Sequence, residues 1–578
     1  MLGIWGVVSG DDAKRQFIGQ LKNDSVLGTL NDVCYFPDGG FGRSLNGKFP
    51  IDKAFDTVNG VFVCSDGVIF NLKRVLEKFG CSNLSEILHM FYMSDLKNIK
   101  LLRGNFIGII YEPKSRKTVL FSDHVGSKPL YYYYDENGAT LFFSSSLHVI
   151  SKMMTYSGFS PKLDVPAAYS LLTFGYMIGD RTLIEKVKKI PPGSMLVFGP
   201  DGITLEKYFS LKCTPYIEDD EQTIIKNLDK LFRNAVYEEY SKDEEYGYQH
   251  LVSLSGGLDS RTTFAYAKDE NFDNITGLTY SDSGYLDDHI ARNICRDFKC
   301  KYIFVPLDNG NYLTENIDEI IRVNNGMVLY SGAAHSYHSY KQFSFSIYGM
   351  VHTGQIGDLI LGSYLRDKKH HAVDDDAVNL IAYSRKLMPK CRRLLSISPS
   401  DYENDELFAF YEKCVNGVFN GYRMIEPFTE YSSPFLNPDL LDYAMKIHPS
   451  LRYKEKIYLK WLNKAIPSYM KYKWERYNIS PRYPLLVMRA YKKLWRLKRK
   501  IVGDERRYSM NPIEYWYKTN KNLSKTIYSY YENNNRVLKN NRELYEDARE
   551  LFETGSFMEK TQVITLLVAV RQMGISVR

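Results

Sequence analysis

The chain has 578 residues, and its 75 Lys and Arg against 68 Asp and Glu leave a formal net charge of +7. This mild basic bias is weaker than the concentrated field of a dedicated nucleic-acid binder. A composition of 44% hydrophobic and 25% charged residues is typical of globular proteins and excludes global disorder, and the length predicts two or more domains. The first residues lack the pattern of a secretion signal, and the apolar run over 563–570 is too short to cross a bilayer, so we expect a cytoplasmic protein.

Up to about residue 210 the chain contains short apolar or alternating runs separated by Gly, Asp and Asn. Such runs predict antiparallel strands. Asn137-Gly138, between LYYYYDE and ATLFFSS, is typical of a hairpin turn. Amphipathic segments over 72–79 and 84–93 predict helices, so we expect sheets with helices packed outside them.

From about residue 220 the pattern changes to helices that alternate with buried strands. ITGLTY and KYIFVPL, separated by HIARNICRDF, predict a parallel strand-helix-strand unit, and 345–352 predicts a further strand. After about residue 430 the chain is mostly helical and aromatic. We therefore expect a sandwich domain over 1–212, an α/β domain over 213–480, and a helical extension over 481–578 that packs on the α/β domain.

The stretch 489–507 contains nine Lys and Arg against Asp504 and Glu505, with Leu494, Leu497 and Ile501 on its apolar side. We interpret it either as a solvated helix face or as a contact with an acidic membrane surface or nucleic acid.

No metal centre is predicted from the cysteines and histidines. The eight cysteines are scattered without a CxxC pair. His370-His371 and the pair His335 and His338 lack Cys or carboxylate partners at metal-ligand spacing.

The strongest chemical signal is SLSGGLDSR over 253–261, between the apolar end of a strand and a helical pattern. It lacks the Gly-Lys-Ser/Thr end of a Walker A loop. Gly256 and Gly257 allow the backbone to approach an anion, the helix N-terminus presents free N–H groups, and Ser255 and Ser260 add hydroxyl donors. Asp259 would repel phosphate, so we interpret it as a ligand of a Mg²⁺ ion that bridges phosphate oxygens. A tight turn capped by Ser and Asp is the alternative.

The string SGGLDS resembles the pyrophosphate loop of ATP-pyrophosphatases, and the chain around it, over roughly 1–480, resembles the asparagine synthetase family. In the N-terminal half LRGNFIGIIYE, LFSDHVGSKPLYYY, LFFSSSLHVI and KKIPPGSMLVF are similar, in order, to segments of that family. TYSDSGYLDDHIARNI, TGQIGDLILGSY and SSPFLNPDLLDYAMKIHPSLR follow in the C-terminal half. The resemblance implies an αββα sandwich like that of N-terminal-nucleophile hydrolases, then a parallel-sheet α/β pyrophosphatase-loop domain with a helical C-terminal part.

The chain departs from the family where the glutaminase reaction takes place. Glutaminase members begin Met-Cys-Gly with the cysteine as nucleophile, whereas this chain begins Met1-Leu2-Gly3, and Leu2 offers no nucleophile. The family's Asn-Gly-Glu falls on Asp66-Gly67-Val68, which puts an anion where an oxyanion needs a donor. Arg43 alone corresponds to the arginine that holds the glutamine carboxylate. We therefore expect no glutaminase activity from this domain.

The resemblance aligns the family's second glycine turn, Ser/Thr-Gly-Glu-Gly-x-Asp, with residues 353–358. Asp358 corresponds to the second Mg²⁺-binding carboxylate. Thr353, Gly354 and Leu254 correspond to contacts with the adenylate.

Two positions depart from the asparagine-synthetase pattern. Gln355 stands where asparagine synthetases carry Glu and β-lactam synthetases carry Tyr, and because Gln accepts no proton at neutral pH, aspartate amidation is open to question. The family lysine that neutralises charge on the acyl-adenylate and pyrophosphate falls, by counting, on Glu475. Lys473 is the nearby candidate for that role, and an exposed basic loop is the other interpretation.

These features predict a ligase that uses ATP and Mg²⁺ to adenylate a small-molecule or peptide carboxylate and joins it to ammonia or an amine. An amine within the same substrate would give a lactam or macrolactam, as in β-lactam synthetases and lasso-peptide cyclases. An RNA-acting pyrophosphatase-loop enzyme and a catalytically degenerate scaffold are the two other hypotheses. The resemblance allows a homodimer, and we expect neither a nucleic-acid partner nor a transmembrane segment.

Overall fold

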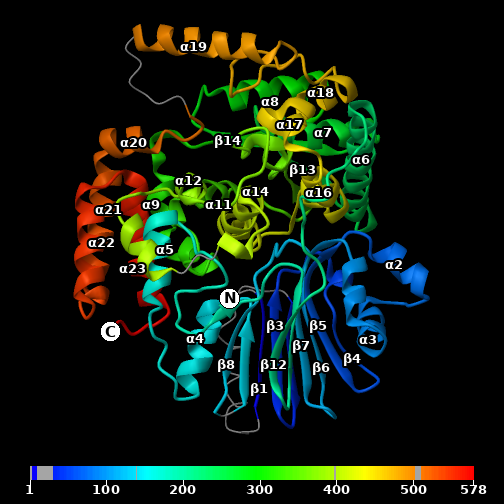
Figure 1. Ribbon diagram of the computed structural model, residues 1–578, viewed down its shortest axis with the longest axis vertical. Helices are drawn as coiled ribbons and strands as arrows, with labels where there is room; N and C mark the ends of the chain where they lie inside the picture. Colours follow the sequence, from blue (N-terminus) through cyan, green and yellow to red (C-terminus); the bar gives the residue numbers. More distant parts are fainter. Residues whose placement is uncertain (1–2, 10–29, 138, 396–398, 502–508) are drawn as a thin grey trace.

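The computed structural model describes residues 3–9, 30–137, 139–395, 399–501 and 509–578, and contains a β-sandwich below a helix-flanked parallel sheet (Figure 1). The predicted Asn137-Gly138 turn lies partly outside the described residues, as does the end of the basic stretch, and Leu2 lies wholly outside them. The strands on either side of that turn pair antiparallel, as predicted.

The sandwich has two sheets, each with six strands in the described part of the chain. Neighbouring strands in both sheets are antiparallel, as the alternating runs predict. The first sheet, in spatial order, is β10 (Lys188–Lys189), β8 (Tyr131–Asp135), β9 (Thr140–Ser144), β1 (Gly3–Val8), β3 (Gly39–Leu45) and β2 (Leu30–Phe36). The second is β12 (Gly202–Lys207), β11 (Ser194–Gly199), β7 (Lys117–Ser122), β6 (Gly104–Glu112), β5 (Val61–Ile69) and β4 (Phe55–Val58).

Alternate residues of the strands enter separate cores, which makes the sandwich four-layered. Ile4 and Val8 pack between the sheets, whereas Trp5 and Val7 face the opposite side of β1. The predicted helices α2 (Leu72–Phe79) and α3 (Leu84–Met93) cover the outer face of the second sheet. Helices α4 (Leu147–Tyr156) and α5 (Val165–Phe174) cover the first sheet, which confirms the αββα arrangement.

The second body is built on a five-stranded parallel sheet in the order β15-β14-β13-β16-β17. Its strands are β13 (Gln249–Ser253), β14 (Ile275–Ser281), β15 (Lys301–Pro306), β16 (Tyr348–His352) and β17 (Tyr431–Ser432). Val252 packs among α6 (Glu221–Glu245), α7 (Leu258–Asp269) and α8 (Leu286–Asp297), while Leu251 packs on the other face with α11 (Ala334–Lys341). The predicted α/β organisation is confirmed.

The remaining helices complete the α/β body and the C-terminal part. Those before residue 470 are α9 (Tyr312–Glu315), α10 (Ile317–Val323), α12 (Asp375–Ile381), α13 (Met388–Leu394), α14 (Asp405–Ala409), α15 (Phe419–Tyr422), α16 (Pro438–Met445), α17 (Pro449–Arg452) and α18 (Lys456–Ala465). A π-helical segment, Phe410–Val418, joins α14 to α15. The C-terminal helices are α19 (Leu485–Ile501), α20 (Ile513–Thr519), α21 (Lys521–Asn534), α22 (Arg542–Thr554) and α23 (Phe557–Gln572).

The C-terminal helices contact more of the molecule than predicted. Helix α23 packs against α10 of the α/β body and also against α5 of the sandwich (Figure 1). Its apolar residues lie on every side, so it becomes buried between the two bodies, whereas an amphipathic helix would cover one of them. No helix in the described part of the chain combines the length and apolarity needed to span a membrane.

A buried cluster of charged side chains, which we call the interdomain ion cluster, joins the sandwich to the parallel sheet. The Nζ atoms of Lys53 and Lys128 lie 2.8 and 2.9 Å from the carboxylate of Glu430, which directly precedes β17. Lys128 also lies 3.2 Å from Asp66 of β5. Burial would raise the pKa of Glu430, but the charges of Lys128 and Lys53 outweigh it and lower this pKa to about 2.

We expect Glu430→Gln to lower the free energy of unfolding by about 3–5 kcal/mol, because two buried ammonium groups lose their shared counter-ion. Urea unfolding at pH 7 measures the change. The matched control is Asp439→Asn, whose partner Arg103 lies across the same interface in an exposed pair, and whose cost should stay below about 1 kcal/mol. Because the Glu430 pKa is lowered, its contribution is complete above about pH 4.5 and is lost as the pH falls toward 2. Equal destabilisation by both variants would contradict the role of the cluster.

Candidate adenylation site

The first glycine turn connects β13 to α7 and is held by its own serines. The backbone N–H of Ser255 donates to Oγ of Ser260 at 3.0 Å, and the two hydroxyl oxygens lie 3.0 Å apart. The N–H of Gly257 donates to Oγ of Ser255 at 3.1 Å. Helix α7 begins at the next residue, so its N-terminal N–H groups and both hydroxyls converge on one place.

The second glycine turn follows β16 and is anchored to the edge strand β17. Thr353 donates its backbone N–H and its hydroxyl to the carbonyl of Ser432, at 2.9 and 2.8 Å. Ile356 has a φ of 60°, a left-handed conformation that costs a β-branched residue about 1–2 kcal/mol. Such strain persists where the surroundings hold it, and it gathers at functional sites.

Gly354 lets the two turns meet. A Cβ atom at Gly354 would lie 2.2 Å from the carbonyl carbon of Asp259 and from the backbone nitrogen of Ser260. These distances are impossible for a side chain, so only glycine permits the contact.

The close approach places the two predicted carboxylates beside each other. The backbone N–H of Asp358 donates to Oδ2 of Asp259 at 3.1 Å, and the hydroxyl of Tyr458 donates to Oδ1 at 2.8 Å. Burial, followed by the negative charge of Asp358, raises the pKa of Asp259 well above its usual value. Two adjacent carboxylates that repel each other at the wall of a cavity form an oxygen donor set that fits Mg²⁺.

Arg476, which the sequence analysis did not single out, is the cation at these carboxylates. Its guanidinium donates to Asp358 at 2.9 Å and to Glu455 at 2.5 Å. Lys473 is exposed, and it is absent from the described residues that line the adjoining cavity. Its carbonyl instead accepts a hydrogen bond of 2.6 Å from Arg261 of α7. The loop therefore presents Arg476, three residues further on, where we expected a lysine.

Asp287 is a second residue that the sequence analysis missed. Its Oδ1 accepts the N–H of Gly256 at 2.8 Å, which fixes the back of the first turn. Burial, then the charge of Glu475, raises the pKa of Asp287 to about 7. Asp287 lies in the segment TYSDSGYLDDHIARNI, next to Asp288 at the start of a helix. The sequence alone gave no reason to assign a role in the site to one of these two acids over the other.

A cavity of about 390 Å³ opens between the two turns. Nearly all of the residues predicted for ATP, metal or catalysis line it: Leu254, Ser255, Gly257, Asp259, Ser260, Thr353, Gly354, Gln355 and Asp358. The rest of the wall is largely aromatic or aliphatic and includes Tyr280, His335, Tyr364, Val418, Tyr422 and Met510.

Two side chains of this wall, Gln355 and His335, have polar atoms without a hydrogen-bond partner among the described residues. Gln355 is only 5% exposed, and neither its Oε1 nor its Nε2 forms a hydrogen bond within the described residues. An unpaired buried amide costs about 1–3 kcal/mol, so this side chain is suited to a ligand that pairs with it. Burial lowers the pKa of His335 to about 4, which keeps its ring neutral at physiological pH.

The π-helical segment Phe410–Val418 separates this cavity from another. Cys414 and Val418 line the cavity between the turns, whereas Glu412 and Asn416 line a cavity of about 380 Å³ beside the sandwich. Lys189 of β10 reaches the second cavity and donates to Asn416.

The region that corresponds to a glutaminase site is filled by charged side chains. Asp66 is paired with Lys128, and the cavity that they border measures about 10 Å³. Arg43 donates to Asp32 at 2.7 Å and to the carbonyl of Lys53 at 2.7 Å. These N–H groups of Arg43 therefore form hydrogen bonds within the sandwich.

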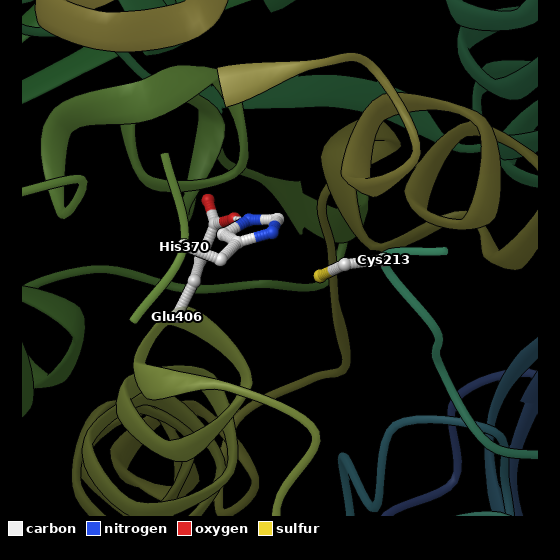
Figure 2. A group of neighbouring side chains, drawn as sticks. All are labelled: Cys213, His370 and Glu406. Atoms are coloured by element: carbon white, nitrogen blue, oxygen red, sulfur yellow. Dashed lines mark hydrogen bonds and ion pairs between the residues drawn. The ribbon is translucent and has the colours of Figure 1, made fainter. Parts of the chain in front are cut away.

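His370 does have neighbouring Cys and Glu side chains, brought from distant parts of the sequence (Figure 2). One ligand atom of each of Cys213, His370 and Glu406 lies within 4.8 Å of the others. Both oxygens of Glu406, however, accept hydrogen bonds from Arg452, and the ring nitrogens of His370 contact Glu406 and Tyr216 at 2.8 and 3.0 Å. The arrangement is that of an ion-pair cluster which fixes the linker between the two bodies.

Comparison with known families agrees with this geometry. Residues 47–209 match a family described as a glutamine amidotransferase domain, and residues 227–407 match asparagine synthase. Together the two matches cover more than half of the chain.

Two curated relatives are asparagine synthetases. The putative glutamine-hydrolyzing asparagine synthetase 2 of Methanocaldococcus jannaschii is 22% identical over 414 residues, or 69% of this chain and 73% of that protein. The glutamine-hydrolyzing asparagine synthetase 3 of Bacillus subtilis is 24% identical over 187 residues, or 32% of this chain, and the match spans only 29% of that protein. The match to a solved glutamine phosphoribosylpyrophosphate amidotransferase from B. subtilis covers 53% of this chain and 91% of that protein's chain, at 12% identity. Its TM-score of 0.27 is too low to inform the fold. With both domain matches in sequence order, the chain belongs to the asparagine synthetase family and carries an amidotransferase-like domain ahead of its asparagine synthase domain.

Proposed function

We propose that this protein is an ATP-dependent ligase that adenylates a carboxylate, releases pyrophosphate, and joins the acyl group to ammonia or an amine without hydrolysing glutamine. The observation that carries the proposal is the pair Asp259 and Asp358, held together by Gly354 beside the N-terminus of α7. A partly exposed pair of carboxylates next to a helix N-terminus suits a metal-bound polyphosphate.

The first turn would hold the phosphates of ATP. The N–H groups at the start of α7 and the hydroxyls of Ser255 and Ser260 point donors toward one place, which favours negative charge. Arg261 supports this turn from behind, because it donates to the carbonyl of Gly256 at 3.0 Å.

Asp259 and Asp358 would hold Mg²⁺, which would neutralise negative charge on the phosphate groups of ATP. Arg476 adds a positive charge at Asp358 that suits the departing pyrophosphate. Through these groups the chain neutralises charge that develops as the carboxylate attacks the α-phosphorus.

The acid would meet an uncharged part of the cavity. Among the described residues that line it there is no Lys or Arg, and His335 is neutral. Gln355 offers one donor and one acceptor to a polar group of the acid or amine. This wall favours an acid whose remainder is neutral or aromatic over the doubly anionic aspartate.

Asp259→Asn and Asp358→Asn should each lower carboxylate-dependent ATP–pyrophosphate exchange by about a hundredfold, or about 3 kcal/mol in the barrier. Asp288→Asn is the matched control, because this carboxylate is shielded from solvent but pairs with Arg292 outside the cavity lining. Thermal unfolding should show that all three variants fold. An unchanged exchange rate in either test variant would remove that carboxylate from the metal site.

The purified protein should release no glutamate from glutamine, with or without Mg·ATP, in an enzyme-coupled glutamate assay. Leu2→Cys alone should not create this activity, since the Asp66–Lys128 pair remains and the adjoining cavity of about 10 Å³ cannot hold glutamine. Glutamate release that follows the protein through a further purification step would contradict the prediction.

Aspartate should support little AMP formation with Mg·ATP and ammonium, whereas some larger acids with an uncharged remainder should support it. The measurement is AMP release together with product mass over a panel of acids. Gln355→Leu should raise KM for the preferred acid about tenfold or more, because the buried amide pairs with the substrate. Efficient asparagine formation by the unmodified protein would overturn this preference, and an unchanged KM in the variant would remove Gln355 from the substrate site.

A further inference from the structure

Helix α19 has a one-sided charge. Its sequence, LLVMRAYKKLWRLKRKI, includes seven basic residues and no acidic one: Arg489, Lys492, Lys493, Arg496, Lys498, Arg499 and Lys500. A solvated helix usually mixes both signs, which gives i,i+4 ion pairs. The absence of acids in this helix therefore indicates a partner that supplies negative charge.

The apolar residues of α19 form a continuous stripe. At 3.6 residues per turn, Leu486, Leu494, Leu497 and Ile501 fall within about a quarter of the circumference. Arg489, Lys492, Arg496 and Arg499 fall on the opposite side of the helix. The helix is thus amphipathic along its length.

The stripe is open to solvent. Leu486, Leu494, Leu497 and Ile501 are 79, 66, 56 and 77% exposed. Met488 is fully buried and fixes the first turns to the α/β body, and Lys492 stacks on the ring of Tyr477 at 5.1 Å. Beyond Met488 no described residue of the helix is buried, and the helix projects from the top of the molecule (Figure 1).

A core or a protein partner explains these features poorly. Exposure of large aliphatic side chains to water is unfavourable, and their transfer to an apolar phase lowers the free energy. Nucleic acid would use the basic side and leave the leucines in water. An anionic bilayer can bind both sides of the helix. The apolar stripe enters the boundary of the acyl chains, while the basic residues remain among the headgroups.

We propose that α19 is a peripheral membrane anchor that binds the surface of an anionic lipid bilayer. The helix lies parallel to the surface, with Leu486, Leu494, Leu497 and Ile501 inserted. Met488 and the Lys492–Tyr477 contact join it to the α/β body, so the adenylation site is held near the membrane.

The test is flotation of the full-length protein with vesicles. The protein should float with vesicles of phosphatidylglycerol and phosphatidylcholine at low salt, and bind vesicles of pure phosphatidylcholine at least about tenfold more weakly. Leu494→Gln/Leu497→Gln should weaken binding to the anionic vesicles at least about tenfold. Arg496→Gln/Arg499→Gln should also weaken it and should reduce its salt dependence.

The matched control is Leu205→Gln/Leu380→Gln. These leucines are 45 and 48% exposed and lie on other elements, so this variant should float like the unmodified protein. The ATP–pyrophosphate exchange rate without vesicles should be the same in every variant, which also separates this test from that of the proposed activity.

Three results would overturn the proposal. The first is no flotation of the unmodified protein with anionic vesicles. The second is loss of binding in the arginine variant only, which would indicate a purely electrostatic contact such as nucleic acid. The third is a vesicle-free oligomer, detected by sedimentation, that Leu494→Gln/Leu497→Gln dissociates, since the stripe would then be a contact between copies of the chain.

Discussion

The contact of Gly354 with the first residues of α7 is the constraint on which the site depends. The two turns come from neighbouring parallel strands, and strand spacing alone would leave their side chains apart. With no Cβ between them, the backbone of one turn lies against the other. The backbone N–H of Asp358 then donates to the carboxylate of Asp259, which places the two acidic residues side by side. The left-handed Ile356 and the anchoring of Thr353 to β17 support the same contact, because both hold the second turn in the required path.

The region of the sandwich that corresponds to the glutaminase site of the family forms part of the interface with the α/β body. Where the resemblance implies a donor for the oxyanion, this chain has Asp66, which pairs with Lys128 in the interdomain ion cluster that also contains Lys53 and Glu430. Buried charges are stable only when they are paired. The two lysines of the sandwich and Glu430 of the α/β body therefore depend on each other, and both bodies must be in place to pair them. The cluster thus fixes the sandwich relative to β17, the strand that also anchors the second turn.

Much of the fold could be predicted because the relevant signals are local. Alternating runs and the turn residues between them indicated the antiparallel strands, and SGGLDS indicated a strand, a turn and a helix in the correct order. The position of Arg476 could not be predicted, because counting residues from Pro467 cannot follow a loop that is fixed by distant contacts such as Arg261 to the carbonyl of Lys473. Asp287 and the group of Cys213, His370 and Glu406 escaped for the same reason, since their meeting depends on tertiary structure. The burial of α23 between both bodies likewise depends on surfaces that no local pattern describes.

The π-helical segment Phe410–Val418 forms a partition between the two cavities. A π turn holds one residue more than an α turn, so conversion of a single turn to α geometry would rotate every later side chain by about 100° about the axis. Cys414 and Val418 would leave one cavity, while the contact of Asn416 with Lys189 in the other would change. The shapes of both cavities therefore depend on the winding of the same nine residues.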